Sequence, residues 1–304
     1  MPASLAAVFI GSDTLLLQCL DAWRERGHRV VLVATDTDKV RRYCAEHELR
    51  CVAADGDLAA RLAGSECDYL FAITWLRMLP TAVLALPKCA ALNFHDGPLP
   101  RYAGLNATCW ALYHGEREHA VTWHRIEARA DTGAIWLQKR FAVAADDTAF
   151  TLNARCFQVG VESFAELCDQ LPAGPLAGTA QELGQRSYFG RRARPAGLAV
   201  LDWQAPAQQS LRTVRAFDHG GYKNPVAVAK VEAPSGVFVP GQVELRPASG
   251  RAPGTVVEVG DDFVVVAGSD GDLRLAGNRC LRGGPLDRTG LAAYGVCLLY
   301  TSDA

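Results

Sequence analysis

The chain has 304 residues, of which 49% are hydrophobic and 21% are charged, and its formal net charge at pH 7 is −2. This composition is typical of a folded globular protein, and a net charge near zero disfavours nucleic acid as a partner without excluding it. No apolar run reaches the roughly 20 residues that a membrane-spanning helix needs and no basic stretch precedes the first apolar run, so we expect a cytoplasmic protein.

The first quarter of the chain alternates short apolar runs with amphipathic segments. The expected strands are residues 6–11, 29–35, 50–54 and 68–74, and the expected helices are 14–27, 37–48 and 57–64. This alternation predicts an α/β fold with a Rossmann-like, mostly parallel sheet. Only Gly11 occurs where a dinucleotide site has the pattern G-x-G-x-x-G, so the fold class does not imply a nicotinamide cofactor.

The second quarter continues with strands and a long helix. Residues 91–95 end a strand, and the segments 120–127 and 134–143 are alternating strands around a turn. A long helix is expected from about Thr148, because one apolar face recurs at steps of three and four residues. That face consists of Phe157, Val161, Phe164, Cys168 and Leu171.

The remainder of the chain changes in composition. Residues 172–202 are rich in Pro, Gly, Ala and Arg and are predicted to be a linker that wraps a surface. A short helix is expected within 201–217, followed by short strands with Gly-rich turns, which favour a small antiparallel barrel. The strand segments are 224–231, 236–246, 254–260, 262–269 and 272–277. The predicted units are therefore residues 1–171, the linker 172–202 and a small barrel domain 203–296.

The final segment, residues 297–304, reads CLLYTSDA. The codons TGT CTC TTA TAC ACA TCT GAC GCT encode it and resemble the transposon-end adapter used to prepare DNA sequencing libraries. We hypothesise that these residues are adapter read-through and that the natural chain continues past Val296.

Cysteine and histidine spacing gives no sign of a metal site. The ten cysteines have no regular spacing and form no C-x-x-C pair, and most lie in apolar segments. They are expected to be reduced core thiols rather than zinc ligands or a disulfide framework. His114, His119 and His124 are five residues apart, which matches neither one helix face nor a common ligand pattern. We predict no metal.

Two polar side chains end the strand at residues 91–95. Asn93 and His95 are two residues apart, so both point to the same face. Such a pair is often a turn-capping Asn beside a hydrogen-bonded His, and Asp131 begins an Asp-Thr-Gly sequence that is common in turns. Taken singly, these residues therefore leave a structural role open.

Together they form part of a longer pattern. Residues 92–138 contain, in order, N-x-H, a Leu-Pro loop, Tyr-x-Gly, Trp-Ala, Gly-Glu, Val-Thr and D-x-G-x-I. This segment resembles the signature of the formyltetrahydrofolate-dependent formyltransferases, and the layout of the whole chain is similar to theirs. The resemblance implies a catalytic domain over residues 1–171, an OB-like C-terminal barrel and N10-formyltetrahydrofolate as co-substrate. It also implies that Asn93, His95 and Asp131 are the catalytic residues.

The chemistry of that family explains these residue types. An amine attacks the formyl carbon, and negative charge develops on the formyl oxygen. Asn93 and His95 are suited to stabilise that charge, and loss of one such donor costs on the order of 100- to 1,000-fold in rate. Asp131 is suited to receive the proton of the amine, directly or through water, and to orient His95. No covalent enzyme intermediate is required.

The resemblance also implies where the folate is held. In similar enzymes the pterin lies against the loop after the fourth strand, mostly through backbone hydrogen bonds and apolar walls. Ordinary loop packing is the alternative reading of this segment, and residues 126–130 are expected to close the other side. The candidate folate contacts are Ile73, Trp75, Leu76, Arg77, Leu79 and Pro80.

The acceptor amine is expected to enter beside the catalytic residues. The pattern departs from the family at two places, Asp96-Gly97-Pro98 and Ala103. Ala103 stands where the family often has the Arg of Tyr-Arg-Gly. Both departures lie where the acceptor should approach, so they bear on the identity of the acceptor. The candidate acceptor contacts are Asp96, Gly97, Leu99, Pro100 and Tyr102.

Several acceptors remain open. The segments HDGPLPRYAG and YKNPVAVAK resemble the formylation domains of nonribosomal peptide synthetases, which favours a carrier-bound aminoacyl group or a hydroxyornithine of a siderophore pathway. A nucleotide-linked amino sugar and initiator methionyl-tRNA are alternatives, although the segment TDTDKVRR mixes acids with bases. Water as acceptor would make the protein a formyltetrahydrofolate hydrolase, and a non-catalytic docking module is disfavoured by the intact trio.

Overall fold

The computed structural model describes residues 4–171, 178–233 and 236–281, so the hypothesis about residues 297–304 lies outside the described residues. The chain divides into two compact units. The first consists of Met1–Ala107, Glu118–Val143 and Asn153–Gly190, and the second of Thr108–Arg117, Ala144–Leu152 and Arg191–Ala304. In the part of the chain that is described, no helix is long and apolar enough to cross a membrane.

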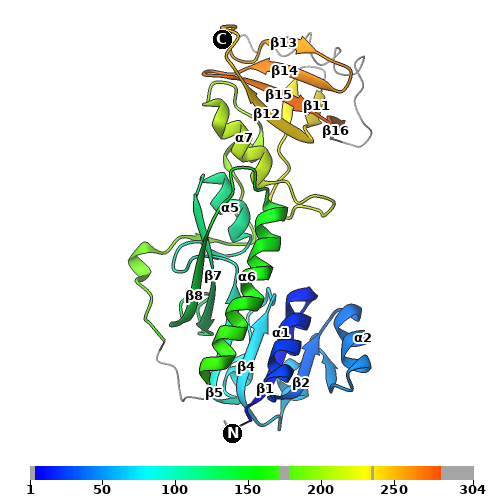
Figure 1. Ribbon diagram of the computed structural model, residues 1–304, viewed down its shortest axis with the longest axis vertical. Helices are drawn as coiled ribbons and strands as arrows, with labels where there is room; N and C mark the ends of the chain where they lie inside the picture. The colour runs from blue at the N-terminus through cyan, green and yellow to red at the C-terminus, as the bar shows by residue number, and fades with distance from the viewer. Residues whose placement is uncertain (1–3, 172–177, 234–235, 282–304) are drawn as a thin grey trace. The chain divides into compact units, whose positions relative to one another are not determined.

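A seven-stranded sheet forms the centre of the first unit (Figure 1). Its strand order is β3-β2-β1-β4-β5-β7-β8, in which β1 to β5 pair in parallel and β7 and β8 are antiparallel. This confirms the Rossmann-like, mostly parallel sheet. The strands are β1 (Ala6–Gly11), β2 (Arg29–Thr35), β3 (Cys51–Ala53), β4 (Cys67–Ile73), β5 (Pro87–His95), β7 (Glu118–Arg125) and β8 (Ile135–Ala142).

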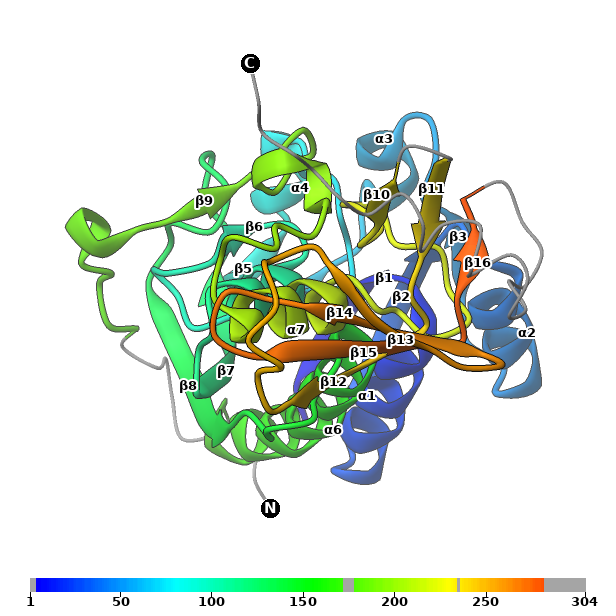
Figure 2. The ribbon, with the colours of Figure 1, turned by 90° about the horizontal axis from the view of Figure 1, so that it is seen from above.

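Helices cover both faces of this sheet, since its central strands are apolar on both sides. Within β1, Phe9 packs in a core cluster with side chains of α1, α2 and α6, whereas Ile10 packs with side chains of α3 and α4 on the other face. Figure 2 shows the two groups of helices on opposite sides. The helices are α1 (Asp13–Glu25), α2 (Asp38–Glu46), α3 (Leu58–Leu62), α4 (Thr81–Leu84) and α6 (Ala149–Gln170). A further helix, α5 (Ala107–Tyr113), belongs to the second unit from Thr108 onward.

Part of the expected linker is built into the first unit. Thr179 forms two backbone hydrogen bonds with Ile135, each 2.8 Å long. The short strand β9 (Tyr188–Phe189) then pairs in parallel with β6 (Ala103–Gly104), and a 3-10 turn, η2 (Leu183–Gln185), lies between these contacts. The domain boundaries expected at residues 171 and 202 remain predictions.

The second unit contains antiparallel sheets and a helix, which agrees with the expected small C-terminal β domain. The sheet orders are β10-β11-β16 and β12-β15-β14-β13. Leu211 and Val214 of the helix α7 pack with Phe238, Val266 and Leu275 in one core. The elements are η3 (Ala196–Ala199), α7 (Ala207–Ala216), β10 (Val231–Ala233), β11 (Gly236–Val239), β12 (Gln242–Arg246), β13 (Val256–Val259), β14 (Phe263–Ala267), β15 (Asp272–Ala276) and β16 (Arg279–Cys280).

The strand expected over residues 224–231 is wrong except at Val231. Asn224 provides the physical reason, because its Oδ1 accepts hydrogen bonds from the backbone N–H groups of Val226 at 2.7 Å and Ala227 at 3.3 Å. Its Nδ2 donates to the carbonyl of Phe217 at 2.8 Å. A side chain bonded to its own backbone in this way stabilises a turn against a strand.

Candidate functional site

Asn93 and His95 lie at the carboxyl end of β5, the edge where open α/β sheets bind their ligands. The antiparallel strand β7 sets their neighbours, because Asn93 is directly opposite His124 and His95 is opposite Thr122. Residues opposite each other in a ladder point to the same face. The face that carries the predicted pair therefore also carries His124.

The side chain of His124 links Asn93 to the backbone. Its Nδ1 lies 2.9 Å from the carbonyl oxygen of Arg125, so Nδ1 is the nitrogen that carries a proton. Its Nε2 is 3.1 Å from Nδ2 of Asn93 and accepts a hydrogen bond from that amide. The ring is only 2% exposed, so the contact is protected from water.

Asp131 lies in the connection between β7 and β8 and faces the same ring. Its Oδ1 is 3.4 Å from Nε2 of His124, and its Oδ2 accepts a 2.7 Å hydrogen bond from the backbone N–H of Gly104. Its φ of 54° is in the left-handed region, which Asp tolerates better than most residues.

The electrostatic surroundings keep Asp131 ionised. Burial raises the pKa of this carboxyl, but the charge of His95, the contacts with His124 and the N–H of Gly104 lower it further, so the net pKa is well below the ordinary value. The structure thus brings together all three residues of the predicted trio around His124, and the carboxylate is the anionic member.

His95 is held by the loop that follows it. Its Nε2 donates to the carbonyl oxygen of Tyr102 at 2.9 Å, and its Nδ1 lies 4.0 Å from Oδ1 of Asp96. A Cβ atom at Gly97 would be 2.8 Å from Nε2 of His95. Glycine is therefore required at position 97, since any side chain would displace the imidazole.

The predicted acceptor contacts differ in their exposure. Leu99 and Tyr102 are buried, and Tyr102 stacks on Phe189 with 5.8 Å between ring centroids. Only the side chains of Asp96 and Pro100 are partly exposed among the five. Ala103, the second departure from the family pattern, is fully buried in β6 and does not reach the surface.

The predicted folate loop follows β4. Ile73 is fully buried in the core, and Leu79 is buried as well, so ligand contacts there are limited to the backbone. Arg77 lies over the ring of Trp75 at 4.0 Å and pairs with Asp36 at 2.8 Å. The other two candidate residues of the loop are accessible to solvent: Pro80 is exposed, and Leu76 is 71% exposed.

The indole N–H of Trp75 is buried and has no hydrogen-bond partner within the described part of the chain. Buried donors without an acceptor are uncommon in folded proteins. A donor of this kind, in a loop next to the strand that carries Asn93 and His95, could bond to a polar acceptor on a ligand.

The segment after residue 178 secures the backbone around Asp131, in a region where the sequence predicts only a linker. Nε2 of Gln181 donates to the carbonyl oxygens of Asp131 at 3.2 Å and Gly133 at 2.6 Å. Nη2 of Arg186 donates to the carbonyl of Ala130 at 3.0 Å. Pairing the segment 91–95 with 120–127 would have found His124, but no local pattern indicates Gln181 or Arg186.

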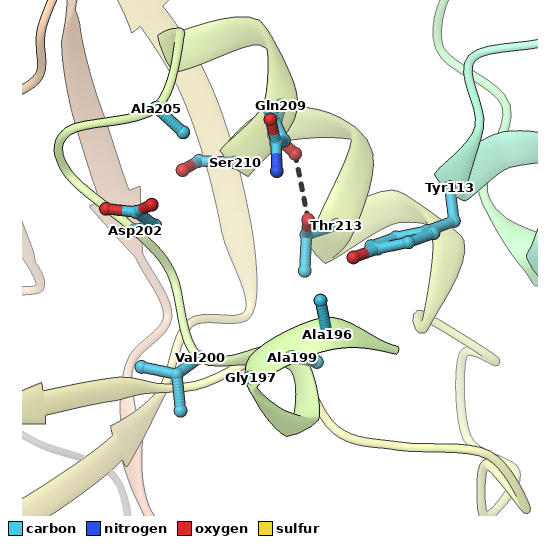
Figure 3. A pocket seen from close by; sticks show the side chains of 10 residues that line it. All are labelled: Tyr113, Ala196, Gly197, Ala199, Val200, Asp202, Ala205, Gln209, Ser210 and Thr213. Carbon is cyan, nitrogen blue, oxygen red and sulfur yellow. Dashed lines mark hydrogen bonds between the residues drawn. The ribbon is translucent and has the colours of Figure 1, made fainter. Parts of the chain in front are cut away.

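A cavity of about 150 Å³ lies in the second unit, and none of the predicted site residues lines it (Figure 3). In Figure 3 the side chains of Asp202, Gln209 and Tyr113 surround it, and Oγ1 of Thr213 donates to the carbonyl of Gln209 at 2.9 Å. Among the described residues no group of three or more His, Cys, Asp or Glu could hold a metal ion. The candidate site is therefore the cluster at the end of β5.

Comparison with known proteins defines the class of this enzyme. The formyl transferase family model matches residues 5–167. The methionyl-tRNA formyltransferase of Paraburkholderia phytofirmans is 31% identical over 300 residues, which cover 90% of each chain, and that of Burkholderia pseudomallei is 30% identical over 304 residues. The chain belongs to the formyl transferase family, the enzymes that transfer formyl groups, as the pattern over residues 92–138 predicted.

Solved structures share the fold. WlaRD, described as a sugar 3N-formyl transferase, superimposes with a TM-score of 0.72 at 17% identity over 90% of this chain and 98% of its own. HypX from Aquifex aeolicus has a TM-score of 0.65 at 21% identity, and the match covers 97% of this chain but 48% of HypX. At these identities the likeness concerns the fold alone.

Proposed function

We propose that this protein transfers the formyl group of N10-formyltetrahydrofolate to the nitrogen of a primary amine. The observation that carries the proposal is the cluster of Asn93, His95 and Asp131 at one sheet edge, with Asp131 held as a carboxylate. The structure of WlaRD was obtained in the presence of 5-N-formyl-THF, and one HypX structure contains tetrahydrofolic acid. These relatives support a folate as the formyl donor.

Asn93 and His95 are proposed to stabilise the formyl oxygen as it becomes negative. The amide of Asn93 has two N–H groups, of which one is bonded to His124, and the other has no partner among the residues that the structure describes and could face the oxygen. His95 donates its Nε2 proton to the carbonyl of Tyr102, which fixes the ring, so a hydrogen bond from His95 to the formyl oxygen would use a proton on Nδ1. Donors already held in place act without reorganisation when the charge develops.

Asp131 is proposed to act on the amine. The nitrogen becomes positive as it attacks, and a carboxylate that stays ionised stabilises that charge and accepts a proton directly or through water. Because its pKa is low, Asp131 is a weak base, and the proton must pass onward from it. Its catalytic contribution is therefore mainly electrostatic.

The loop after β4 is proposed to hold the pterin. Trp75 offers an N–H without a partner in the described chain, and Leu76 offers an exposed apolar surface. The donor supplies an activated formyl group, and the loop supplies orientation. Arg77 is already paired with Asp36, so we propose that its role is to support the ring of Trp75, over which it lies. Residues 126–130 are proposed to close the opposite side.

For the acceptor, we propose a cationic primary amine such as a carrier-bound aminoacyl group or a hydroxyornithine, as in peptide or siderophore biosynthesis. The supporting observation is Asp96, whose side chain is 28% exposed and whose carboxylate is 4.0 Å from Nδ1 of His95. A carboxylate at this position attracts an ammonium group and repels a polyanion.

Methionyl-tRNA is a second candidate acceptor. It is favoured by the 31% identity with a methionyl-tRNA formyltransferase over 90% of both chains. A nucleotide-linked amino sugar remains a third alternative, supported by the fold shared with WlaRD.

The test is incubation of the purified protein with N10-formyltetrahydrofolate and a panel of amines that includes methionyl-tRNA. Gain of one formyl group is measured by mass, and a reaction without amine detects hydrolysis to formate. Asn93→Ala and Asp131→Ala should abolish transfer while folate binding is retained. Unchanged transfer in these variants would overturn the proposed roles, and formate release alone would identify a hydrolase.

A further inference from the structure

We infer that His124 is a positioning residue that orients the amide of Asn93, so that an N–H group rather than the carbonyl oxygen faces the formyl group. This inference rests on the proposed function, because it assigns a purpose to the contact between β5 and β7. The contact is the 3.1 Å hydrogen bond from Nδ2 of Asn93 to Nε2 of His124.

An asparagine amide does not orient itself. Its oxygen and its NH2 group have almost the same shape, and rotation by about 180° exchanges them at little steric cost. With Oδ1 of Asn93 towards the formyl oxygen, two acceptors would face each other and the residue would oppose the charge it is meant to stabilise. A neighbouring group of defined polarity must therefore select one orientation.

His124 has that defined polarity. Its Nδ1 proton is directed to the carbonyl of Arg125 at 2.9 Å, and a carbonyl only accepts. In the neutral ring this leaves Nε2 as an acceptor, which attracts Nδ2 of Asn93 and repels Oδ1. The backbone of β7 thus specifies the tautomer, and the tautomer specifies the orientation of the amide.

The placement of the ring is itself defined by the strand register. His124 is opposite Asn93 in β7, and a bulge in the pairing with β8 lies between Trp123 and His124. Bulges change the direction of a side chain and are frequent beside active sites. The ring is 2% exposed, so water does not compete for Nε2.

Asp131 limits how His124 can act. Its carboxylate is 3.4 Å from the same Nε2, so an N–H group at Nε2 would donate to Asp131. Asn93 would then have to present Oδ1 to His124 instead of Nδ2. The neutral ring is the state that orients the amide as the structure has it. In that state the low pKa of Asp131 rests on His95 and on the backbone N–H of Gly104 rather than on a hydrogen bond from His124, and His124 has no need to touch the substrate.

The test compares two substitutions. His124→Met removes the acceptor but keeps apolar volume, and should lower kcat by up to about 100-fold, approaching the loss of the Asn93 donor itself. KM for folate and amine should change little. His124→Gln keeps an oxygen that can accept from Asn93, and the carbonyl of Arg125, which only accepts, should direct the Gln NH2 group away from Asn93. This variant should retain most of kcat. His47→Met, on an exposed site in the first unit, is the matched control and should be unchanged.

A double-mutant cycle tests whether His124 acts through Asn93. In the Asn93→Ala background, His124→Met should cause no further loss of kcat, because the amide it orients is gone. Additive losses would overturn the inference. Equal defects in His124→Gln and His124→Met, with the Asn93 amide still ordered, would instead make His124 a proton carrier and overturn the positioning role.

Nuclear magnetic resonance of the protein without substrates gives a readout independent of activity. In the wild type and in His124→Gln we expect one side-chain amide proton of Asn93 to be hydrogen-bonded and its resonance to be shifted downfield. In His124→Met we expect neither the hydrogen bond nor the shift. The ¹⁵N spectrum of His124 should show a proton on Nδ1 alone, and a proton on Nε2 would overturn the inference. If the wild type formylates no amine, the proposed function fails, while these spectra still decide the geometry.

Discussion

The backbone N–H of Gly104 donates a 2.7 Å hydrogen bond to Oδ2 of Asp131, although the two residues are 27 positions apart. The bond joins the loop after β5 to the connection between β7 and β8. It stabilises the charged form of Asp131 and directs the other oxygen, Oδ1, towards His124. The position of the carboxylate thus depends on the path of the backbone at Gly104.

Gly104→Ala should therefore impair both stability and activity. The φ of Gly104 is 100°, and an added Cβ would be 2.3 Å from the carbonyl oxygen of Phe189, so the backbone must move away from Asp131. We expect a loss of about 1–3 kcal/mol in the free energy of unfolding and a fall in kcat. Gly64→Ala is the control, because its φ is also positive at 75° but no atom of the described residues lies within 4 Å of the added Cβ. Equal kcat in both variants would contradict the role of this bond.

The low pKa of Asp131 predicts how stability varies with pH. Its folded pKa is below the unfolded value, so the ionised group contributes stability above the unfolded pKa of about 3.9, and this contribution is lost as the pH falls through the folded pKa. The difference in unfolding free energy between wild type and Asp131→Asn should be largest above about pH 5 and shrink in acid. Chemical denaturation at several pH values measures this difference in unfolding free energy. A difference that does not change with pH would argue against an ionised Asp131 in the folded protein.

Gln181→Ala should reduce kcat without removing any group from the reaction. The Gln181 amide bonds the carbonyls of Asp131 and Gly133, and its loss leaves both without that donor at a cost of about 1–3 kcal/mol. The freed turn should orient Asp131 less well. Gln185→Ala is the control on the same segment, since within the described part of the chain its side-chain amide bonds to the exposed Glu182 alone. Thermal unfolding and kcat are measured together, and identical behaviour of the two variants would exclude a supporting role for Gln181.

Asp96→Asn distinguishes the acceptor classes. If the acceptor is a cationic amine, loss of the Asp96 charge should raise its KM by several-fold with little change in kcat. If the acceptor is a nucleotide sugar or tRNA, the same change should lower KM, because repulsion is removed. Steady-state kinetics with the best amine of the panel decides between them, and Glu46→Gln on the exposed end of α2 controls for net charge.

The sequence by itself determined the features that depend on local pattern. The alternation of apolar residues placed β2 at residues 29–35, and the spacing of Asn93 and His95 predicted that they share a face. The order of the motifs over residues 92–138 predicted the family, since those residue types are required by the chemistry. Local order along one strand or one motif needs no knowledge of distant partners.

Only the tertiary structure revealed what surrounds the trio. His124 lies beside Asn93 because of the register between two antiparallel strands, and Gln181 reaches Asp131 across 50 positions of sequence. The Pro, Gly, Ala and Arg composition of residues 172–202 predicted a linker, whereas β9 within this range pairs with β6 and supports the site. The strand registers and the carbonyl acceptors of Gln181 are backbone features that every residue offers. They therefore leave no signature in the local sequence and are decided only when distant segments pack together.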